Sequence, residues 1–592
     1  MKNILKLTLA YFLLLSNGIN FTLFAQETFK VHSHNDYEQQ LPFWYAFSNG
    51  AASIEADIFL KNNELYVTHS EDEIDAKATL ENMYLKKLES LAASGELREL
   101  QLLVDIKSDA YKTLDKLVEV LKRYPSVIDN KKVRFVISGN RPEPEDYNNY
   151  PDFIWFDHQN LNNLDKIDLK KVALVSVSFK TYTVWNGYGR MVAKEQEKVE
   201  GAIKKAHDVS RPFRFWATPD TKTAWANLAK LGVDYINTDE PALAKQYLSK
   251  LANNTYSQKE PIEIYKPVYG YNKDETPQNI ILMIGDGNGL AQISAAMIAN
   301  RGELTLTGIK DVGLAKTASF DNLITDSAAG ATAMATGTKT NNRAIGVDPA
   351  GKALDNLVTM ANQQGFNTAI VSTDAIYGAT PASFYAHRAE RDNTDGIVED
   401  LVHSKLDFFM AGGKNEENTI GKQFKTVTID SFTDFNQPIA VYLGDEKAPS
   451  MINGRENALP NSVHKALEVL GSKEEPFFLM VEGAQIDNGG HSNNIQGIIK
   501  EMLDFDRAIA QALRFADTHK NTLVVITADH ETSGLGIVGG DIESGTVQAD
   551  FLTVDHTGIM VPVFAYGPQA ENFKGVFENT SIFKKIWKAI NK

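Results

Sequence analysis

Residues 279–289 read NIILMIGDGNG, an uninterrupted apolar run that ends in an acidic residue and a glycine-rich turn. Short apolar runs of this kind are typical of strands that are buried on both faces of a parallel sheet. Four later runs repeat the pattern: NTAIVST (367–373), PFFLMVEG (476–483), TLVVITADH (522–530) and MVPVFAYG (560–567). Because helical stretches separate them, the sequence predicts an α/β fold with a mostly parallel sheet over residues 277–592.

Residues with metal-binding side chains follow these runs, at the edge where open α/β sheets bind ligands. The chain has no cysteine, so any zinc must be held by His, Asp or Glu, and disulfides and thiolate nucleophiles are excluded. Carboxylates mixed with imidazoles suit zinc. The strings MIGDGNG, IDNGGH, TADHE and DHTG therefore predict two zinc sites built from Asp286, Asp487, His491, Asp529, His530 and His556.

Ser327 lies in TDSAAG, between small residues and just before the helical pattern ATAMATG. A serine at a helix N-terminus meets free N–H groups and the positive end of the helix dipole, which suits phosphate. Alone, the residue would be interpreted as an ordinary helix cap. Beside two metal sites it becomes the expected nucleophile for attack on a phosphoryl group.

The first half of the chain, residues 27–252, predicts a (β/α)8 TIM-like barrel. Eight β-rich runs alternate with polar or amphipathic stretches, and ELYVTH (64–69) looks like an added strand. The runs are FKVHS (29–33), SIEADIF (53–59), LQLLVDI (100–106), VRFVIS (133–138), FIWFD (153–157), VALVSVS (172–178), FRFWAT (213–218) and DYINTD (234–239).

Polar side chains gather at the ends of the early barrel strands, which meet at one mouth. Glu55 and Asp57 are two apart and share one side of their strand, and Asp105 ends the third run. Three carboxylates suit Ca²⁺ or Mg²⁺, and nearby imidazoles suit proton transfer. The imidazoles are His69 and either His34 or His32, between which the spacing does not choose.

Composition sets the location and the partners. The net charge of −16 argues against nucleic-acid binding. Lys2 and Lys6 precede the apolar run LTLAYFLLL, so residues 1–25 are expected to be a signal peptide, with cleavage after Ala25 as the expected site and an uncleaved anchor as the alternative. Since no other long apolar segment exists, we expect an exported protein, periplasmic or secreted, without a stable membrane span. Residues 253–276 are polar and proline-containing, as in a linker.

The second half, nearly all of residues 277–592, resembles the alkaline phosphatases, with its motifs in the family's order. The resemblance implies an α/β sandwich that hydrolyses phosphate monoesters through a phosphoserine, with two zinc ions and one magnesium. It implies that Asp487, His491 and His556 hold the first zinc, and that Asp529 and His530 complete the second. Asp286 would bridge the second zinc and the magnesium. Thr380 in GATPASFYAH and Glu482 in VEGAQID match the magnesium ligands. Arg391 matches the arginine that binds phosphate, oriented by Asp326.

Two positions depart from that family's pattern. Gly378 and Asn488 stand where some members carry charged or imidazole groups around the magnesium. Groups around the ligands tune metal preference and rate.

The first half resembles the glycerophosphodiester phosphodiesterase and phosphatidylinositol phospholipase C-like barrels over about residues 30–250, including FWATPD with Trp216 and GVDYINTDEP. The resemblance implies that Glu55, Asp57 and Asp105 hold the metal, that His34 (or His32) and His69 transfer the proton, and that Lys107 contacts the phosphate.

Together the halves suggest an enzyme for phosphate mono- and diesters, in which the barrel supplies monoesters to Ser327. The alternatives are a phosphatase whose barrel only binds a ligand and a phosphate-binding protein without turnover. A homodimer is compatible with the resemblance.

Overall fold

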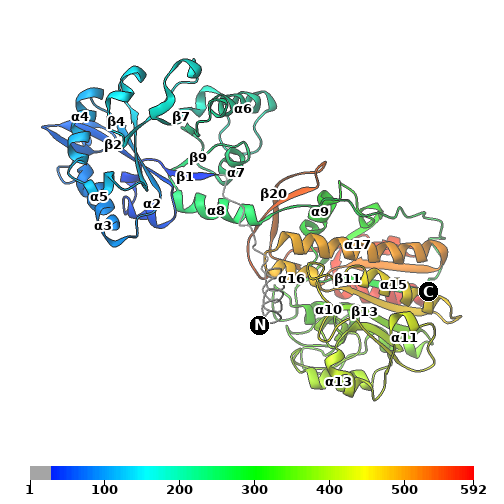
Figure 1. Ribbon diagram of the computed structural model, residues 1–592. Helices are drawn as coiled ribbons and strands as arrows, with labels where there is room; N and C mark the ends of the chain where they lie inside the picture. Colours follow the sequence, from blue (N-terminus) through cyan, green and yellow to red (C-terminus); the bar gives the residue numbers. More distant parts are fainter. Residues whose placement is uncertain (1–28, 592) are drawn as a thin grey trace, which may run out of the picture. The chain divides into compact units, whose positions relative to one another are not determined.

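The computed structural model describes residues 29–591, which form two compact units that meet in sequence between Ala252 and Asn253 (Figure 1). The expected signal peptide, residues 1–25, lies outside the described residues. Among residues 29–591, no helix combines the length and the apolar character that crossing a membrane requires.

The first unit is a closed parallel barrel, as the sequence predicts. It closes because β1 pairs in parallel with both β2 and β9. All eight predicted strands form, and ELYV forms β3 (Glu64–Val67), an antiparallel hairpin partner of β2. The barrel strands are β1 (Lys30–Ser33), β2 (Ser53–Lys61), β4 (Leu100–Ile106), β5 (Val133–Gly139), β6 (Ile154–His158), β7 (Val172–Ser178), β8 (Phe213–Trp216) and β9 (Tyr235–Thr238).

The ring of helices around the barrel is uneven. Regular helices follow most strands: α2 (Trp44–Ser48), α3 (Lys86–Ser94), α4 (Ala110–Leu121), α6 (Ala193–Asp208), α7 (Lys222–Lys230) and α8 (Pro241–Asn253). After β5 and β6 the chain forms the 3-10 turns η4 (Pro144–Asn149), η5 (Leu164–Lys166) and η6 (Leu169–Lys171) instead. These two connections are short and rich in Pro, Asn and Asp, which favour turns over helix.

The second unit contains a ten-stranded sheet in which β23 runs antiparallel to both neighbours and the other pairings are parallel. The five predicted apolar runs form β11, β13, β17, β18 and β23. In order across the sheet the strands are β15 (Lys425–Thr426), β16 (Ile439–Tyr442), β14 (Phe408–Gly412), β13 (Asn367–Ala375), β17 (Phe477–Gly483), β11 (Asn279–Gly285), β18 (Thr522–Thr527), β23 (Val561–Tyr566), β12 (Asp311–Lys316) and β24 (Gly575–Glu578).

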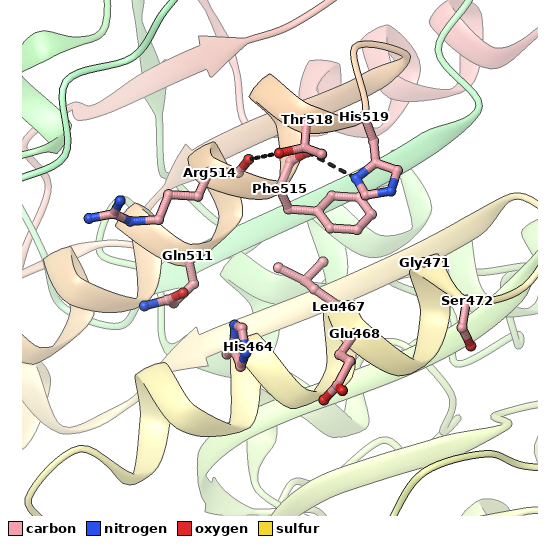
Figure 2. A pocket seen from close by; sticks show the side chains of 10 residues that line it. All are labelled: His464, Leu467, Glu468, Gly471, Ser472, Gln511, Arg514, Phe515, Thr518 and His519. Carbon is pink, nitrogen blue, oxygen red and sulfur yellow. Dashed lines mark hydrogen bonds between the residues drawn. The ribbon is translucent and has the colours of Figure 1, made fainter.

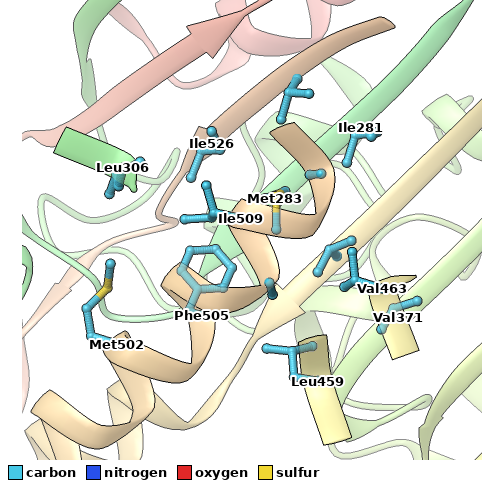
Figure 3. Packing of buried hydrophobic residues seen from close by; sticks show 14 of the residues in the cluster. Ile281, Met283, Leu306, Val371, Leu459, Val463, Met502, Phe505, Ile509 and Ile526 are labelled. Atoms are coloured by element: carbon cyan, nitrogen blue, oxygen red, sulfur yellow. The ribbon is translucent and has the colours of Figure 1, made fainter. Parts of the chain in front are cut away.

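Helices cover both faces of this sheet, which explains its continuous apolar strands. Ile281 and Met283 of β11 point into one core, and Ile280 and Leu282 into the other, since strand side chains alternate. The first core packs α17 (Ile495–Thr518) and α15 (Ala458–Gly471) against the sheet (Figure 3), together with α9 (Leu290–Ala299). The second core packs α10 (Ser327–Thr336), α11 (Leu357–Gln363) and α18 (Thr580–Ile590).

Residues 253–276, the expected linker, pack along the second unit. Strand β10 (Thr255–Ser257) joins a small sheet with β21 (Thr546–Phe551) and β20 (Leu535–Asp541). Further on, the Tyr265 hydroxyl donates to Asp517 Oδ2 at 2.6 Å, and the Tyr269 backbone N–H donates to Tyr566 Oη at 2.7 Å. This segment is therefore an ordered strap on the second unit.

Candidate functional site

Ser327 is the first residue of α10 and is buried. Asp326 caps the helix, because its Oδ1 accepts the Ala329 backbone N–H at 3.0 Å. Small residues let α10 pack tightly: a Cβ at Gly330 would stand 3.0 Å from the Asp529 side chain. The serine Oγ lies 3.3 Å from Nε2 of His530. The start of α10 thus lies beside a predicted ligand that comes from 203 positions later in the sequence.

The structure brings Asp286, Asp529 and His530 together at the carboxyl ends of the neighbouring strands β11 and β18. One ligand atom of each lies within 4.8 Å of the others, and all three residues are buried. His530 Nε2 is 3.4 Å from both Asp286 Oδ1 and Asp529 Oδ2. Among residues 29–591, neither of these two oxygens has a hydrogen-bond partner. Buried acceptors of this kind fit a cation.

The electrostatics of this set also suit a metal. Burial and the charge of Asp487 raise the pKa of Asp529 to about 6, and burial with the charge of Asp529 raises the pKa of Asp286 well above its usual range. Burial and the charge of His556 lower the pKa of His530 to about 3. A zinc ion binds a neutral imidazole, and its charge would stabilise the ionised forms of these carboxylates.

Asp487, His491 and His556 form the second set, again with ligand atoms within 4.8 Å. The residues come from α16 (Gln485–His491) and β22 (His556–Thr557). His491 Nε2 lies 3.2 Å from Asp487 Oδ2 and 3.2 Å from His556 Nε2. Each histidine has Nδ1 against a backbone carbonyl, at 2.7 Å from Val554 O and 2.9 Å from Thr325 O. These contacts turn both Nε2 atoms inward, the usual arrangement of imidazole ligands.

The pKa values of this set follow from the same contacts. Burial alone would raise the pKa of Asp487, but the hydrogen bond to His491 and the charges of the imidazoles outweigh it and lower the pKa. The bond to Asp487 in turn raises the pKa of His491 to about 9. This set of three residues thus already stabilises positive charge between its side chains.

Thr380 and Glu482 lie beside these sets, on α12 (Ala379–Ala382) and at the end of β17, and both are buried. Glu482 accepts a hydrogen bond from the Ser372 hydroxyl. Burial and the charge of Asp374 raise the pKa of Glu482 to about 8, and the Glu482 charge contributes to the raised pKa of Asp286. With Asp286, these residues supply the hard oxygen ligands that magnesium prefers.

Arg391 completes this site. Its Nη1 donates to Asp326 Oδ2 at 3.0 Å. Asp326 therefore caps α10 with one oxygen and holds the guanidinium with the other, which fixes Arg391 next to Ser327. The charge of Asp326 raises the pKa of Arg391, although burial opposes it. A planar guanidinium there can donate two hydrogen bonds to phosphate oxygens.

The barrel brings Glu55, Asp57 and Asp105 together, with ligand oxygens within 4.8 Å. Asp57 and Asp105 are register partners on the parallel strands β2 and β4. Asp57 Oδ1 is buried without a hydrogen-bond partner in the part of the chain that the structure describes. Lys107 Nζ lies 3.0 Å from Asp57 Oδ2 and 3.1 Å from Asp105 Oδ1. The donor set fits a hard cation, but a protein cation already contacts it.

The two histidines of HSHND differ. His32 is fully buried, with Nδ1 2.8 Å from Ser53 Oγ and Nε2 2.7 Å from Glu55 Oε2. His34 is partly exposed and bonds Asp239 Oδ1 through Nδ1 at 2.6 Å. His69 bonds Asp57 Oδ2 through Nδ1 at 2.9 Å. Of the two histidines in HSHND, only His34 is partly exposed to solvent.

Sequence reasoning missed three residues of the barrel site. Arg214 is buried and its Nη1 lies 2.7 Å from His32 Nε2, while its Nη2 lies 3.3 Å from Asp157 Oδ2. The Tyr37 hydroxyl donates to Asp57 Oδ2 at 2.8 Å. Asp239 holds His34. An arginine inside the apolar run FRFWAT and an acid just after DYINT were the available signals.

A cavity of about 410 Å³ lies between α15 and α17, away from this chemistry (Figure 2). Leu467, Phe515 and His519 are among its lining residues, and the His519 ring stacks on Phe515 at 4.0 Å. None of the ligand residues named above, all within residues 29–591, contributes to its wall. The cavity therefore does not mark the catalytic site.

The two units of the chain are similar to different families of known proteins. A model of the family "Alkaline phosphatase" matches residues 277–428, 442–549 and 543–592. Alkaline phosphatase 3 of Bacillus subtilis is 30% identical over 417 residues, covering 54% of this chain and 90% of that protein. Alkaline phosphatase of Escherichia coli is 31% identical over 401 residues, covering 52% and 85%.

Solved structures agree for the second unit. Alkaline phosphatase from the Antarctic bacterium TAB5 superposes with a TM-score of 0.51 at 39% identity, covering 54% of this chain and 98% of that chain. A variant of that enzyme has been solved with Mg bound. In the first unit, an "AIM6-like phosphodiesterase domain" model matches residues 24–96, and a model of the "Glycerophosphoryl diester phosphodiesterase family" matches residues 212–242.

Proposed function

This chain belongs to the alkaline phosphatase family, and from that premise we propose that it hydrolyses phosphate monoesters through a phosphoserine intermediate on Ser327. The observation that carries the proposal is that Ser327 Oγ lies 3.3 Å from His530 Nε2, a member of one ligand set, while the preceding residue, Asp326, accepts a hydrogen bond from the guanidinium of Arg391. The first unit is a phosphodiesterase-like barrel.

In the proposed site, Asp487, His491 and His556 hold one zinc ion, and Asp529 and His530 hold the second together with Asp286. Asp286 also contributes to a magnesium site with Thr380 and Glu482. The support is chemical. One set has facing Nε2 atoms, another has buried carboxylate oxygens that lack hydrogen-bond partners among residues 29–591, and the third consists of oxygen ligands alone. Such ions polarise phosphoryl oxygens and favour the ionised forms of attacking hydroxyl groups and water.

The residues of the chain would then divide the reaction into two transfers. Ser327 Oγ attacks phosphorus as the ester oxygen departs with a proton, which leaves phosphoserine and an alcohol. Arg391 and the N-terminal N–H groups of α10 bind the phosphoryl oxygens in both steps. Water then attacks phosphorus, the bond to Ser327 Oγ breaks, and inorganic phosphate leaves.

Hydrolysis of p-nitrophenyl phosphate tests the proposal. Ser327→Ala should reduce kcat/KM by at least ~10³-fold, because the nucleophile is lost while the ligand sets stay. Ser544→Ala, an exposed serine of the β20–β21 hairpin, is the matched control and should change nothing. Wild-type activity that survives complete removal of zinc and magnesium would contradict the metal roles.

We also propose that the barrel cleaves phosphodiesters and so supplies monoesters to Ser327. Glu55, Asp57 and Asp105 would hold Ca²⁺ or Mg²⁺, while His34 and His69 transfer the proton. The support is that each imidazole bonds a carboxylate through Nδ1, which orients its Nε2. Lys107 would contact the substrate phosphate.

Bis(p-nitrophenyl) phosphate separates the two activities. In Ser327→Ala the barrel alone should still release one nitrophenol per molecule. The triple variant that adds His34→Ala and His69→Ala is the control and should release none. Lack of diester cleavage by Ser327→Ala would refute the tandem reaction.

The position of Lys107 favours a second candidate for the barrel, a module that binds a phosphate-containing ligand without cleaving it. Its ammonium group already pairs with both Asp57 and Asp105 and offsets part of their negative charge. In that case His34→Ala and His69→Ala would leave every hydrolytic rate unchanged and weaken only ligand binding.

Export is the remaining part of the proposal, supported by the basic start and the apolar run of residues 1–25. Sequencing the N-terminus of protein collected outside the cytoplasm should give Gln26. An intact Met1 there would contradict cleavage.

A further inference from the structure

Gly378 is a glycine for reasons of space. It precedes α12 with φ −60° and ψ 161°, a conformation that every residue type adopts. A Cβ at this position would lie 2.1 Å from Oδ2 and 2.7 Å from Cγ of Asp374. The Asp374 carboxylate therefore occupies the volume that a side chain at position 378 would fill.

The backbone delivers Asp374 to that volume. The residue lies near the end of β13, where the register against β14 shifts between Val371 and Ala375. Such irregularities redirect side chains and are common beside active sites. The Asp374 backbone N–H donates to Ser372 Oγ at 2.8 Å, and the same hydroxyl donates to Glu482. One serine thus fixes Asp374 and Glu482 relative to each other.

The charge of Asp374 acts on two functional groups. After burial, it is the largest cause of the raised pKa of Glu482, and it also raises the pKa of Arg391. Its carboxylate is therefore close to both the proposed magnesium site and the phosphate-binding guanidinium. Burial raises the pKa of Asp374 itself, while the charges of Lys447 and Arg391 oppose that rise and Glu446 adds to it.

We propose that Asp374 is a positioning residue of the phosphatase site, whose carboxylate reaches across Gly378 to orient the water ligands of the magnesium ion. The inference rests on the proposed magnesium site of Asp286, Thr380 and Glu482. Magnesium retains several waters when it binds protein, and carboxylates that accept hydrogen bonds from those waters strengthen binding. The missing side chain at position 378 is thereby replaced by one from four residues earlier. An additional carboxylate and no imidazole also favours magnesium over zinc at this position.

Magnesium affinity provides a test that does not depend on turnover. The metal-free full-length protein is reloaded with two equivalents of zinc and titrated with Mg²⁺ by calorimetry. Asp374→Asn and Asp374→Ala should weaken Mg²⁺ binding by about 10–100-fold. Glu446→Gln, which removes an exposed negative charge from the same neighbourhood, is the control and should bind Mg²⁺ as the wild type does.

A swap of the carboxylate distinguishes positioning from a general structural role. Gly378→Asp alone should bind Mg²⁺ more weakly than the wild type, because its side chain collides with Asp374. Adding Gly378→Asp to Asp374→Ala should recover affinity to within about threefold of the wild type, since the carboxylate returns to the same volume.

Two results would overturn the proposal: wild-type Mg²⁺ affinity in Asp374→Ala, or a double variant no better than that single variant. Failure of the underlying site is seen separately in the wild type, as zinc binding without any Mg²⁺ binding.

Discussion

The two units of the chain gather carboxylates in different ways. In the phosphatase site, Asp286, Asp529 and Glu482 are buried with raised pKa values, and Arg391 pairs with Asp326 rather than with them. In the barrel, Lys107 pairs with Asp57 and Asp105, and Arg214 with Asp157 and Glu55. One site would therefore take its positive charge from metal ions, whereas the other carries much of its own. The stability of the two units in the absence of metal ions should therefore differ.

Metal removal should have the largest effect. We expect chelation of zinc and magnesium to lower the unfolding temperature of the phosphatase unit by at least about 10 °C, because the proposed ions bind only the folded state. The barrel transition should move much less, since Lys107 and Arg214 remain. Differential scanning calorimetry measures both transitions, and returning the two metals should restore the first. Equal shifts would break the comparison.

Arg214→Met should have the next largest effect. The substitution leaves Asp157 and Glu55 buried without their shared cation, and we expect the barrel to lose about 3–5 kcal/mol of unfolding free energy. The urea-induced unfolding transition of the barrel measures the loss, and Arg214→Lys is the milder control. An unchanged barrel would show that the guanidinium is not needed to neutralise the carboxylates.

Lys107→Met would leave the barrel carboxylates Asp57 and Asp105 without their lysine partner, and so more like the carboxylates of the phosphatase site. With the ammonium group gone, Asp57 and Asp105 repel each other, and we expect a loss of about 2 kcal/mol. Added Ca²⁺ or Mg²⁺ should then stabilise the variant barrel more than the wild-type barrel. Thermal unfolding with and without each cation tests this. Stabilisation equal to that of the wild type would mean that Lys107 and the cation do not compete.

The smallest expected effect concerns the strap of residues 253–276. Tyr265→Phe removes one hydrogen bond to Asp517 and should destabilise the phosphatase unit by about 1 kcal/mol. The barrel transition should stay where it is. Tyr256→Phe is a suitable control, because among the described residues the Tyr256 hydroxyl bonds only Gln258, which lies in the strap itself. A shift of the barrel transition instead would assign the strap to the other unit.

The sequence predicted the features that arise from local patterns. Eight barrel strands were recognisable from short β-rich runs, and the ligand sets followed because parallel strands end at one edge, which brings Asp286 and Asp529 together across 243 positions of sequence. Helices after β5 and β6 did not form, because Pro, Asn and Asp favour turns there. The spacing of the strands suggested a helix in each of these connections, but the local sequence supports helix formation there only weakly.

Other features depended on tertiary contacts that no local pattern records. Arg214 meets His32 from 182 residues away, inside a run that looks like an ordinary strand. Gly378 looked like the loss of a functional side chain, whereas the structure places Asp374 in the vacated volume. Residues 253–276 have the composition of a linker, yet their tyrosines find hydroxyl and carboxylate partners on distant helices and strands.

The pairing of β1 with β9 affects the order in which the chain can be completed during synthesis. β1 is made first among the barrel strands, but its partner β9 follows about 200 residues later, so at ~5–20 residues per second the ribosome needs roughly 10–40 s to supply it. Until then the nascent barrel has two open edges. Closure of the barrel must therefore wait until nearly the whole first unit has been made.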